Sequence, residues 1–179
     1  EAAILYRTNN QSAVIEQALR RRGIPYRIYK GSSFYDHKEI KDMLGYIRLV
    51  INPKDDEAFK RVINTPARGI GDTTVERIAA IAASKGSSMW EAIDTLSSEP
   101  PKDSVEKAIV KKVTDFVSFI RTVALEREQK SIYDFGMEVA TRSGLLTSYR
   151  TQNTPEAQSA IGNIEELLNT MQLFKEQRD

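Results

Sequence analysis

Residues 55–74 read DDEAFKRVINTPARGIGDTT, and this stretch decides the fold of the chain. The two aspartates are typical of a helix start, and apolar residues at helical spacing follow them. After a proline and two glycines, a second helical pattern continues through Val75, Ile78 and Ile81. We therefore expect two helices joined by a turn at Gly69-Ile70-Gly71.

The same two signals, an N-cap residue and apolar residues every three or four positions, recur on both sides of this stretch. Further helices are predicted to start near Asp36, Ser88, Val105, Ser131 and Thr154. In the first of them, Asp36 and Glu39 are spaced as a capping box. The helix from Val105 is the longest and is predicted to run to about Glu128, with one buried apolar stripe that includes Val105.

The N-terminal residues follow a different pattern. Residues 2–6 form an apolar run of strand length, a helical pattern ends at Arg20-Arg21-Arg22, and residues 25–29 alternate like a second strand. The expected fold class is therefore mainly α, with a helix–GIG–helix turn and a short N-terminal β-α-β remnant. Because the first strand has no cap or turn ahead of it and the chain stops at Asp179 without a C-cap, we expect both ends to be truncated.

Composition excludes several classes of protein and site. The chain of 179 residues is 40% hydrophobic and 28% charged, which is typical of a globular protein. It has no stretch long enough to span a membrane and no secretory signal, which favours a cytoplasmic protein. With no cysteine and a single histidine, His37, it cannot form a disulfide, the usual zinc sites or a Ser-His-Asp or Cys-His nucleophile.

Phosphate-binding nucleotide motifs are also absent from the sequence. There is no GxxxxGK[ST] loop and no Gly-rich dinucleotide turn after a strand. The paired carboxylates Asp55-Asp56 and Glu165-Glu166 are interpreted as a helix start and a solvated helix face. We therefore expect no catalytic residue, no metal and no cofactor in this chain.

Charge is distributed unevenly along the chain. Residues 1–71 contain 13 Lys/Arg against 8 Asp/Glu, a net of +5, whereas residues 72–179 contain 13 against 17, a net of −4. A basic first part is what a phosphate-binding protein would show. Ordinary fluctuation of surface charge is the alternative.

The glycine turn is the first candidate binding site. Its glycines allow close approach of the backbone, and the following helix start presents N–H groups with partial positive charge to phosphate. Arg68 and the hydroxyl of Thr73 or Thr74 could add contacts that are independent of base sequence. The alternative is a tight helix connection that needs glycine only for its geometry.

The second candidate is an aromatic and basic segment over residues 26–48. It interleaves aromatic side chains with lysines and arginines, a composition that stacks on unpaired bases and follows a strand backbone. The alternative is that Phe34 and Tyr46 belong to the core and that the lysines are solvated.

Ordered motifs relate the chain to a known family. The stretch ILYRTNNQS at residues 4–12 is similar to the LYRTNxQS stretch of UvrD/PcrA-type helicases of superfamily 1. The similarity continues through Ile24-Pro25-Tyr26, Ser33-Phe34-Tyr35, residues 38–42, residues 46–49, Asn52-Pro53, Asp55-Asp56 and residues 64–71, and more weakly through residues 156–159 and 163–167. The resemblance covers the whole chain and is strongest to about residue 80.

The resemblance implies an architecture and a role. Residues 1–29 would be part of a RecA-like domain, 2A, and residues 30–179 its helical 2B insertion. The parent protein would be an ATP-dependent 3′-to-5′ DNA helicase that binds ATP and Mg, with its nucleotide motifs outside this chain. Its partners would be single-stranded DNA, the duplex junction, the remaining helicase domains and repair proteins.

The resemblance also implies residue roles. Arg7 and Arg48 would face the translocating single strand, while Gly69, Ile70, Gly71 and Thr74 would hold duplex phosphates. The sequence departs from the family pattern at four positions where arginines or a glutamate are common: Ala13, His37, Ala160 and Gly162. These departures would weaken any contact that relatives make there.

Three functions remain open on sequence alone. The first is the DNA-contacting part of such a helicase, without ATPase activity of its own. The second is a weak duplex-binding module. The third is a non-catalytic regulatory or protein-interaction subdomain of the same motor, with an exposed apolar patch on the acidic helices after Val105.

Overall fold

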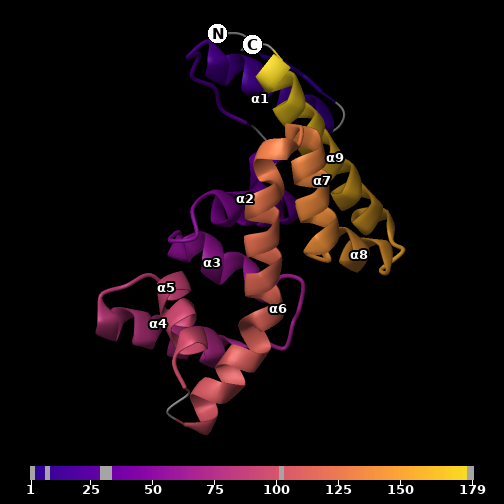
Figure 1. The fold of residues 1–179 in the computed structure, drawn as a ribbon. Coiled ribbons are helices and arrows are strands. Elements are labelled where there is room, and N and C mark those ends of the chain that lie inside the picture. The colour runs from indigo at the N-terminus through magenta and orange to yellow at the C-terminus, as the bar shows by residue number, and fades with distance from the viewer. Residues whose placement is uncertain (1–2, 7–8, 29–33, 101–102, 177–179) are drawn as a thin grey trace.

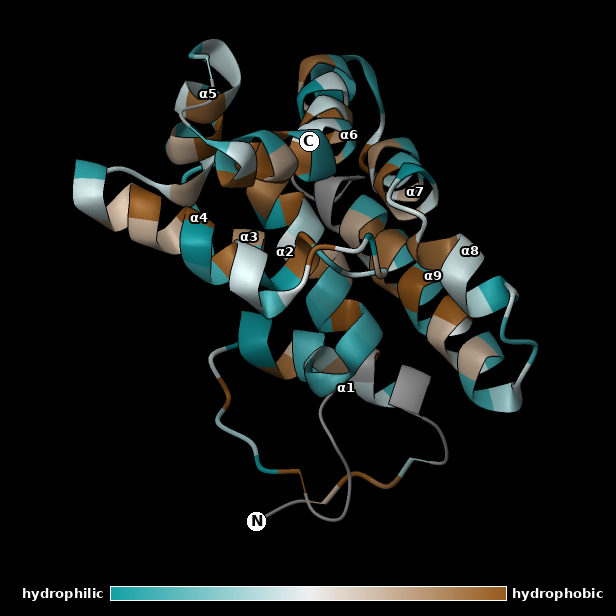
Figure 2. Cartoon of the chain, turned by 90° about the horizontal axis from the view of Figure 1, so that it is seen from below, coloured by the Kyte–Doolittle hydropathy of each residue, from teal (hydrophilic) through white to brown (hydrophobic). Residues whose placement is uncertain are grey.

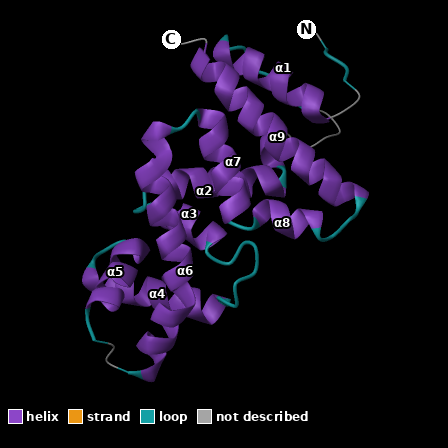
Figure 3. Ribbon diagram, turned by 45° about the vertical axis from the view of Figure 1, so that its right-hand side comes forward, coloured by secondary structure: helices purple, strands orange, loops and turns teal. Residues whose placement is uncertain are grey.

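The chain is mainly helical in this computed structural model, which describes residues 3–6, 9–28, 34–100 and 103–176. Figure 3 shows helices joined by loops along the described chain. In chain order the elements are α1 (Asn9–Arg21), η1 (Phe34–Asp36), α2 (Lys38–Ile51), α3 (Asp56–Val62), α4 (Asp72–Lys85), α5 (Met89–Ser98), α6 (Ser104–Glu126), η2 (Arg127–Gln129), α7 (Ile132–Arg142), α8 (Leu145–Arg150) and α9 (Pro155–Glu176).

The long helix α6 is the centre of the arrangement. Figure 1 shows α2 and α3 on one side of it, α7 and α9 on the other, and α4 with α5 beside its N-terminal part. Helix α1 lies at the opposite end of the molecule, beside the C-terminal part of α9. One continuous core joins α2 to α9, and its largest fully buried side chains include Tyr46, Phe34, Phe59 and Phe116.

Amphipathic helices build this core. Figure 2 shows hydrophobic and hydrophilic residues alternating along the helices, as expected when each buries one face. On α6 the buried apolar residues recur every three or four positions at Ile109, Val113, Phe116, Ile120 and Val123. The expected stripe is confirmed except at Val105, which is 48% exposed in the first turn of the helix.

Local caps start most of the helices where the sequence indicated. Asp55 accepts a hydrogen bond of 3.0 Å from the N–H of Ala58, and Ser88 forms a complete capping box with Glu91. Comparable caps begin α7 and α9 at Ser131 and Thr154. These side chains satisfy N–H groups that have no partner inside the helix, which is why they mark helix starts.

The expected β-α-β arrangement is not present in the described residues. Helix α1 forms as predicted, but residues 3–6 and 24–28 are not strands. A strand is stabilised by hydrogen bonds to a neighbouring strand. Neither segment is paired in this way with any other described part of the chain.

The capping box expected at Asp36 and Glu39 is not formed. Helix α2 begins at Lys38, with His37 at the N-cap position and no side-chain cap. The carboxylate of Glu39 instead accepts a hydrogen bond of 2.6 Å from the amide Nδ2 of Asn163 on α9. A tertiary contact has therefore replaced the local cap that the spacing predicted.

Two glycines allow helices to pack closely. A Cβ on Gly45 of α2 would lie 2.9 Å from Val62 of α3, and a Cβ on Gly136 of α7 would lie 2.2 Å from Leu168 of α9.

Within the described residues, none of the helices combines the length and apolar character needed to cross a membrane.

Candidate functional site

The connection from α3 to α4 carries the predicted glycine turn. Figure 1 shows it as a loop beside α6. Gly69 has a φ of +70°, a conformation that favours glycine. Gly71 is the N-cap residue of α4, with no side chain to cap the helix. A Cβ at either position would meet no atom within 4 Å, so the backbone is open to solvent here.

Asn64 organises the turn from inside. Its carboxamide oxygen Oδ1 accepts hydrogen bonds from the N–H groups of Arg68 at 2.7 Å and Ile70 at 3.2 Å. The side chain of Ile70 is fully buried and anchors the turn in the core. Ile70 therefore cannot offer a side chain or a free N–H group to a ligand, whereas Gly69 and Gly71 on either side are exposed.

The start of α4 presents unpaired N–H groups. Those of Gly71, Asp72 and Thr73 donate to no acceptor among the described residues, whereas the N–H of Thr74 donates to Gly71 O at 2.9 Å. The partial positive charge of a helix start is concentrated on such groups. Asp72 places an exposed carboxylate in the same first turn, and its charge opposes an incoming anion.

Arg68 does not point away from the protein at this turn. Its Nη1 donates to the carbonyl oxygens of Val62 at 3.1 Å, Ile63 at 3.3 Å and Pro66 at 3.1 Å. Its Nη2 donates to the hydroxyl of Tyr46 and to the carbonyl of Ser143, both at 2.6 Å. The structure therefore places this predicted phosphate ligand in an internal hydrogen-bond network.

Tyr46 is the buried centre of that network. Its side chain is fully buried, and its hydroxyl also lies 3.2 Å from the carbonyl oxygen of Val62. Burial raises the pKa of Tyr46 to about 12, so the hydroxyl keeps its proton at neutral pH. The interpretation of Phe34 and Tyr46 as core residues is confirmed, since neither ring is exposed.

Arg48, in the last turn of α2, lies beside the N-terminal end of α3, whereas the turn follows the C-terminal end of α3. Its side chain is 61% exposed, and its Nη2 lies 2.6 Å from Asp55 Oδ2. The pKa of Asp55 is lowered, first by the hydrogen bond from the N–H of Ala58 and then by Arg48. Arg48 is thus oriented by the same carboxylate that caps α3.

A groove between α2 and α3 gathers further basic residues near Arg48. Its volume is about 650 Å³, and its lining contains Lys41, Arg48, Lys60 and Arg61 against the single acid Glu57. These cations belong to ion pairs in which the cation itself stays partly exposed, including Lys41–Asp36 and Arg61–Asp42, although the Asp42 side chain is buried. Lys60 and Arg61 were not among the predicted site residues, because only the packing of the two helices brings them beside Arg48.

Other predicted positions are placed differently. Arg7 lies outside the described residues, as do Tyr29 and Lys30 of the aromatic and basic segment. Of the four departures from the family pattern, His37 lies with its Nδ1 3.6 Å from Glu39, Ala160 is buried, and Gly162 has open space around it. Nothing is described of the side chain at position 13.

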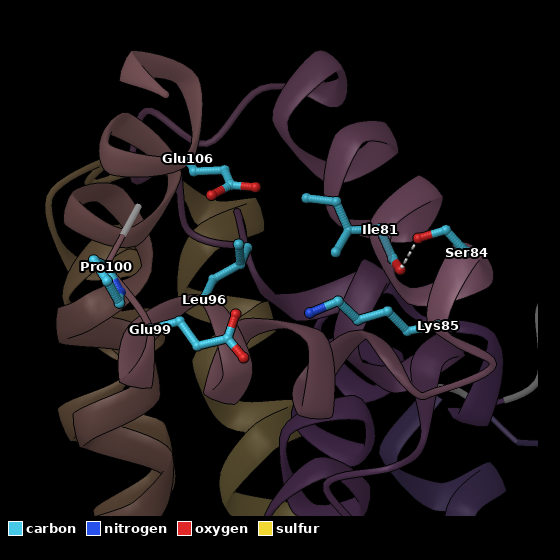
Figure 4. A pocket seen from close by; sticks show the side chains of 7 residues that line it. All are labelled: Ile81, Ser84, Lys85, Leu96, Glu99, Pro100 and Glu106. Atoms are coloured by element: carbon cyan, nitrogen blue, oxygen red, sulfur yellow. Dashed lines mark hydrogen bonds between the residues drawn. The ribbon is translucent and has the colours of Figure 1, made fainter. Parts of the chain in front are cut away.

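A second, smaller cavity of about 150 Å³ lies between the end of α4, α5 and the start of α6 (Figure 4). Lys85, Glu99 and Glu106 line it, so its charge is net negative, and it lies at the far end of α4 from the turn. In the part of the chain that is described, no group of acidic and histidine side chains could hold a metal ion. By contrast, the turn presents unpaired N–H groups and the basic groove presents cations.

Comparison with known proteins matches the whole chain to one family. The family model for the UvrD-like helicase C-terminal domain covers residues 1–179. The ATP-dependent DNA helicase PcrA of Bacillus subtilis is 37% identical over 179 residues, which is 100% of this chain and 24% of the relative. DNA helicase II of Escherichia coli is 37% identical over 174 residues, 97% of this chain and 24% of the relative. This chain therefore spans about a quarter of the length of these relatives.

Proposed function

The chain belongs to the family of UvrD-like helicase C-terminal domains, and from this premise we propose that it is a DNA-contacting part of an ATP-dependent DNA helicase. It binds the phosphates of single-stranded and duplex DNA without reading base sequence. The glycine turn is the main contact with the duplex, and Arg48 in its groove contacts a strand backbone. The observation that carries this proposal is the set of exposed, unpaired N–H groups at Gly71, Asp72 and Thr73.

The geometry of the turn supports a phosphate contact. A phosphate oxygen can approach the backbone because neither Gly69 nor Gly71 has a neighbour where a side chain would stand. The 14 residues of α4 align their peptide dipoles behind these N–H groups. The carboxylate of Asp72 reduces the attraction, so we expect weak binding that is sensitive to salt.

The α2–α3 groove supports a second contact. The side chains of Lys41, Arg48 and Lys60 are 45%, 61% and 47% exposed, so their charges can reach a backbone that follows the groove. Each can exchange its present carboxylate partner for a phosphate, because surface ion pairs contribute only about 0–1 kcal/mol. Such contacts position a strand and carry no sequence information.

The division of the chain follows from the same proposal. Residues 1–29 belong to the 2A RecA-like domain of the parent helicase and residues 30–179 to its 2B subdomain. ATP and Mg bind elsewhere in the parent, whose remaining domains, DNA and repair proteins are the partners of this part. We expect no DNA-stimulated ATP hydrolysis by the 179-residue chain, and measurable turnover in a sensitive phosphate-release assay would contradict that expectation.

No specific observation favours the alternative of a protein-interaction subdomain. Among the described residues, the exposed large apolar side chains after residue 104 are Val105, Leu125 and Leu173. Val105 and Leu125 lie at opposite ends of α6, about 30 Å apart at the usual rise of a helix. Val105 and Leu125 therefore do not belong to one patch, and single exposed apolar residues are normal for a protein surface.

Replacement of Gly71 tests the proposed duplex contact. Gly71→Leu adds bulk over the exposed N–H groups at an ordinary φ of −78°, so the fold tolerates it. We expect its affinity for a short labelled duplex, measured by fluorescence anisotropy, to fall by about tenfold, since contacts to a charged oxygen are lost. Gly162→Leu is the matched control, because Gly162 also has open space around it but lies on α9. Equal affinities of the two variants would remove the turn from the interface.

A further inference from the structure

The guanidinium of Arg68 occupies the C-terminal ends of two helices at once. Val62 and Ile63 are the last residue and the C-cap of α3, and Ser143 is the C-cap of α7. Carbonyl groups at these positions have no partner inside a helix and carry partial negative charge. Arg68 donates to all three, so its positive charge is already matched within the protein.

Aromatic rings enclose the same group. The guanidinium carbon lies 5.4 Å from the ring centre of Phe116 and 5.8 Å from that of Tyr46. Both N–H groups of Nη2 have acceptors at 2.6 Å, in Tyr46 and Ser143. A phosphate could bind Nη2 only if these buried acceptors were left unpaired, which is costly.

The backbone of Arg68 connects this network directly to the turn. Its own N–H donates to Asn64 Oδ1, the atom that also accepts from Ile70, and the next residue is Gly69, with its φ of +70°. The side chain is thus held to α3, α7 and the core, while the main chain of the same residue begins the exposed turn. The orientation of the N–H groups at Gly71 and Asp72 depends on where this residue is fixed.

We infer that Arg68 is a positioning residue that orients the turn toward DNA phosphate from behind and does not contact the phosphate itself. The inference rests on the proposed function of the turn. It distinguishes two arginines that were both predicted from sequence to contact DNA. Arg48 offers an exposed charge to a phosphate, whereas Arg68 fixes the position of the turn backbone. Arg68 therefore acts on the backbone of residues 69–73, and it affects DNA binding only through the position of that backbone.

The salt dependence of duplex binding distinguishes the two roles. Each phosphate contact by a cation that is lost reduces the slope of log affinity against log salt by about 0.9. We expect Arg48→Ala to reduce the slope by this amount. Arg68→Ala and Arg68→Lys should each lower duplex affinity by about tenfold and leave the slope unchanged, because hydrogen bonds to the turn N–H groups release no counterion-bearing charge. Arg127→Ala is the charge-matched control, since Arg127 follows α6, far from the turn.

A spectrum of the turn keeps the test independent of the duplex contact. At a temperature where each variant is folded, the amide resonances of Gly69 and Gly71 should shift in Arg68→Lys and in Tyr46→Phe, which keep the positive charge but disturb the network. A general loss of stability would not move these two resonances selectively. If the unchanged protein fails to bind duplex, the proposed function fails, and this spectrum alone decides the role of Arg68.

Two results would overturn the inference. One is a slope reduced by about 0.9 in Arg68→Ala, which would make Arg68 a phosphate ligand. The other is that the amide resonances of Gly69 and Gly71 stay unchanged in both Arg68→Lys and Tyr46→Phe. Where the unchanged protein binds duplex, this result would also include the same duplex affinity in both variants as in the unchanged protein.

Discussion

The Nη2 atom of Arg68 donates a hydrogen bond of 2.6 Å to the hydroxyl of Tyr46, a residue 22 positions earlier in the chain. This contact joins the loop before the glycine turn to the middle of α2. It lies behind the exposed backbone that we propose as the duplex contact. The stability of the network and the function of the turn can therefore be tested separately.

Removal of the Tyr46 hydroxyl should destabilise the chain. Tyr46→Phe removes the hydroxyl that accepts from an N–H of Arg68 and donates to the carbonyl oxygen of Thr65, and it leaves both groups short of a partner in a buried place. We expect the free energy of unfolding in urea to fall by about 1–3 kcal/mol. Tyr133→Phe is the control, because the Tyr133 hydroxyl has no hydrogen bond to the described residues and its loss should cost less than about 0.5 kcal/mol.

The close packing of α7 against α9 makes a second prediction. Gly136→Ala would place a methyl group 2.2 Å from Leu168 Cδ2, and Leu168 is fully buried and cannot move aside freely. We expect a loss of about 1–3 kcal/mol in the free energy of unfolding. Gly162→Ala on α9 has open space and should instead stabilise the helix by up to about 1 kcal/mol. Equal effects of the two substitutions would show that the α7–α9 contact is looser than described.

The capping box of α5 should make stability depend on acid pH. The pKa of Glu91 is lowered from 4.5 to about 2, first by Lys54 and then by hydrogen bonds from Ser88. Because the folded pKa lies below the ordinary value, the stabilisation is complete above pH 4.5 and is lost as the pH falls toward 2. In Glu91→Gln, the stability measured by urea unfolding should vary less across this window. The same pH dependence in both proteins would exclude Glu91 as its source.

The pairing of Arg48 with Asp55 predicts a gain of binding. Asp55→Asn keeps an N-cap side chain on α3 but removes the charge that lies 2.6 Å from Arg48. The freed guanidinium should bind phosphate more readily, so duplex affinity measured by anisotropy should rise. Asp115→Asn, an exposed change on α6, also removes one negative charge and controls for net charge. A rise of the same size in both variants would reveal a general charge effect and no specific role for Arg48.

The sequence predicted the elements that depend on local signals. Helix starts at Asp55, Ser88, Ser131 and Thr154 follow from short-range hydrogen bonds, which periodicity and residue type reveal. The two strands predicted on either side of α1 are absent from the described residues there, since a strand depends on a neighbouring strand that no local pattern supplies. The short helix α8, in contrast, is present but was not predicted, because its six residues are too few to show a clear helical period.

The candidate site was predicted only in part, for the same reason. The glycines of the turn are visible in sequence because the conformation needs them locally. The internal role of Arg68 was not visible, since its partners Tyr46 and Ser143 lie 22 and 75 residues away. The basic groove likewise depends on the packing of α2 against α3, which places Lys60 and Arg61 beside Arg48.

An amide-resolved titration with duplex DNA tests the central proposal most directly. The ¹H–¹⁵N spectrum of the chain should show its largest changes at Gly71, Asp72 and Thr73, the residues with exposed and unpaired N–H groups. These changes should weaken as salt is added, because the lysines and arginines of the groove that bind the same DNA release counterions from its phosphates. Duplex binding that leaves these three resonances unchanged, while others shift, would contradict the proposal that this turn holds DNA.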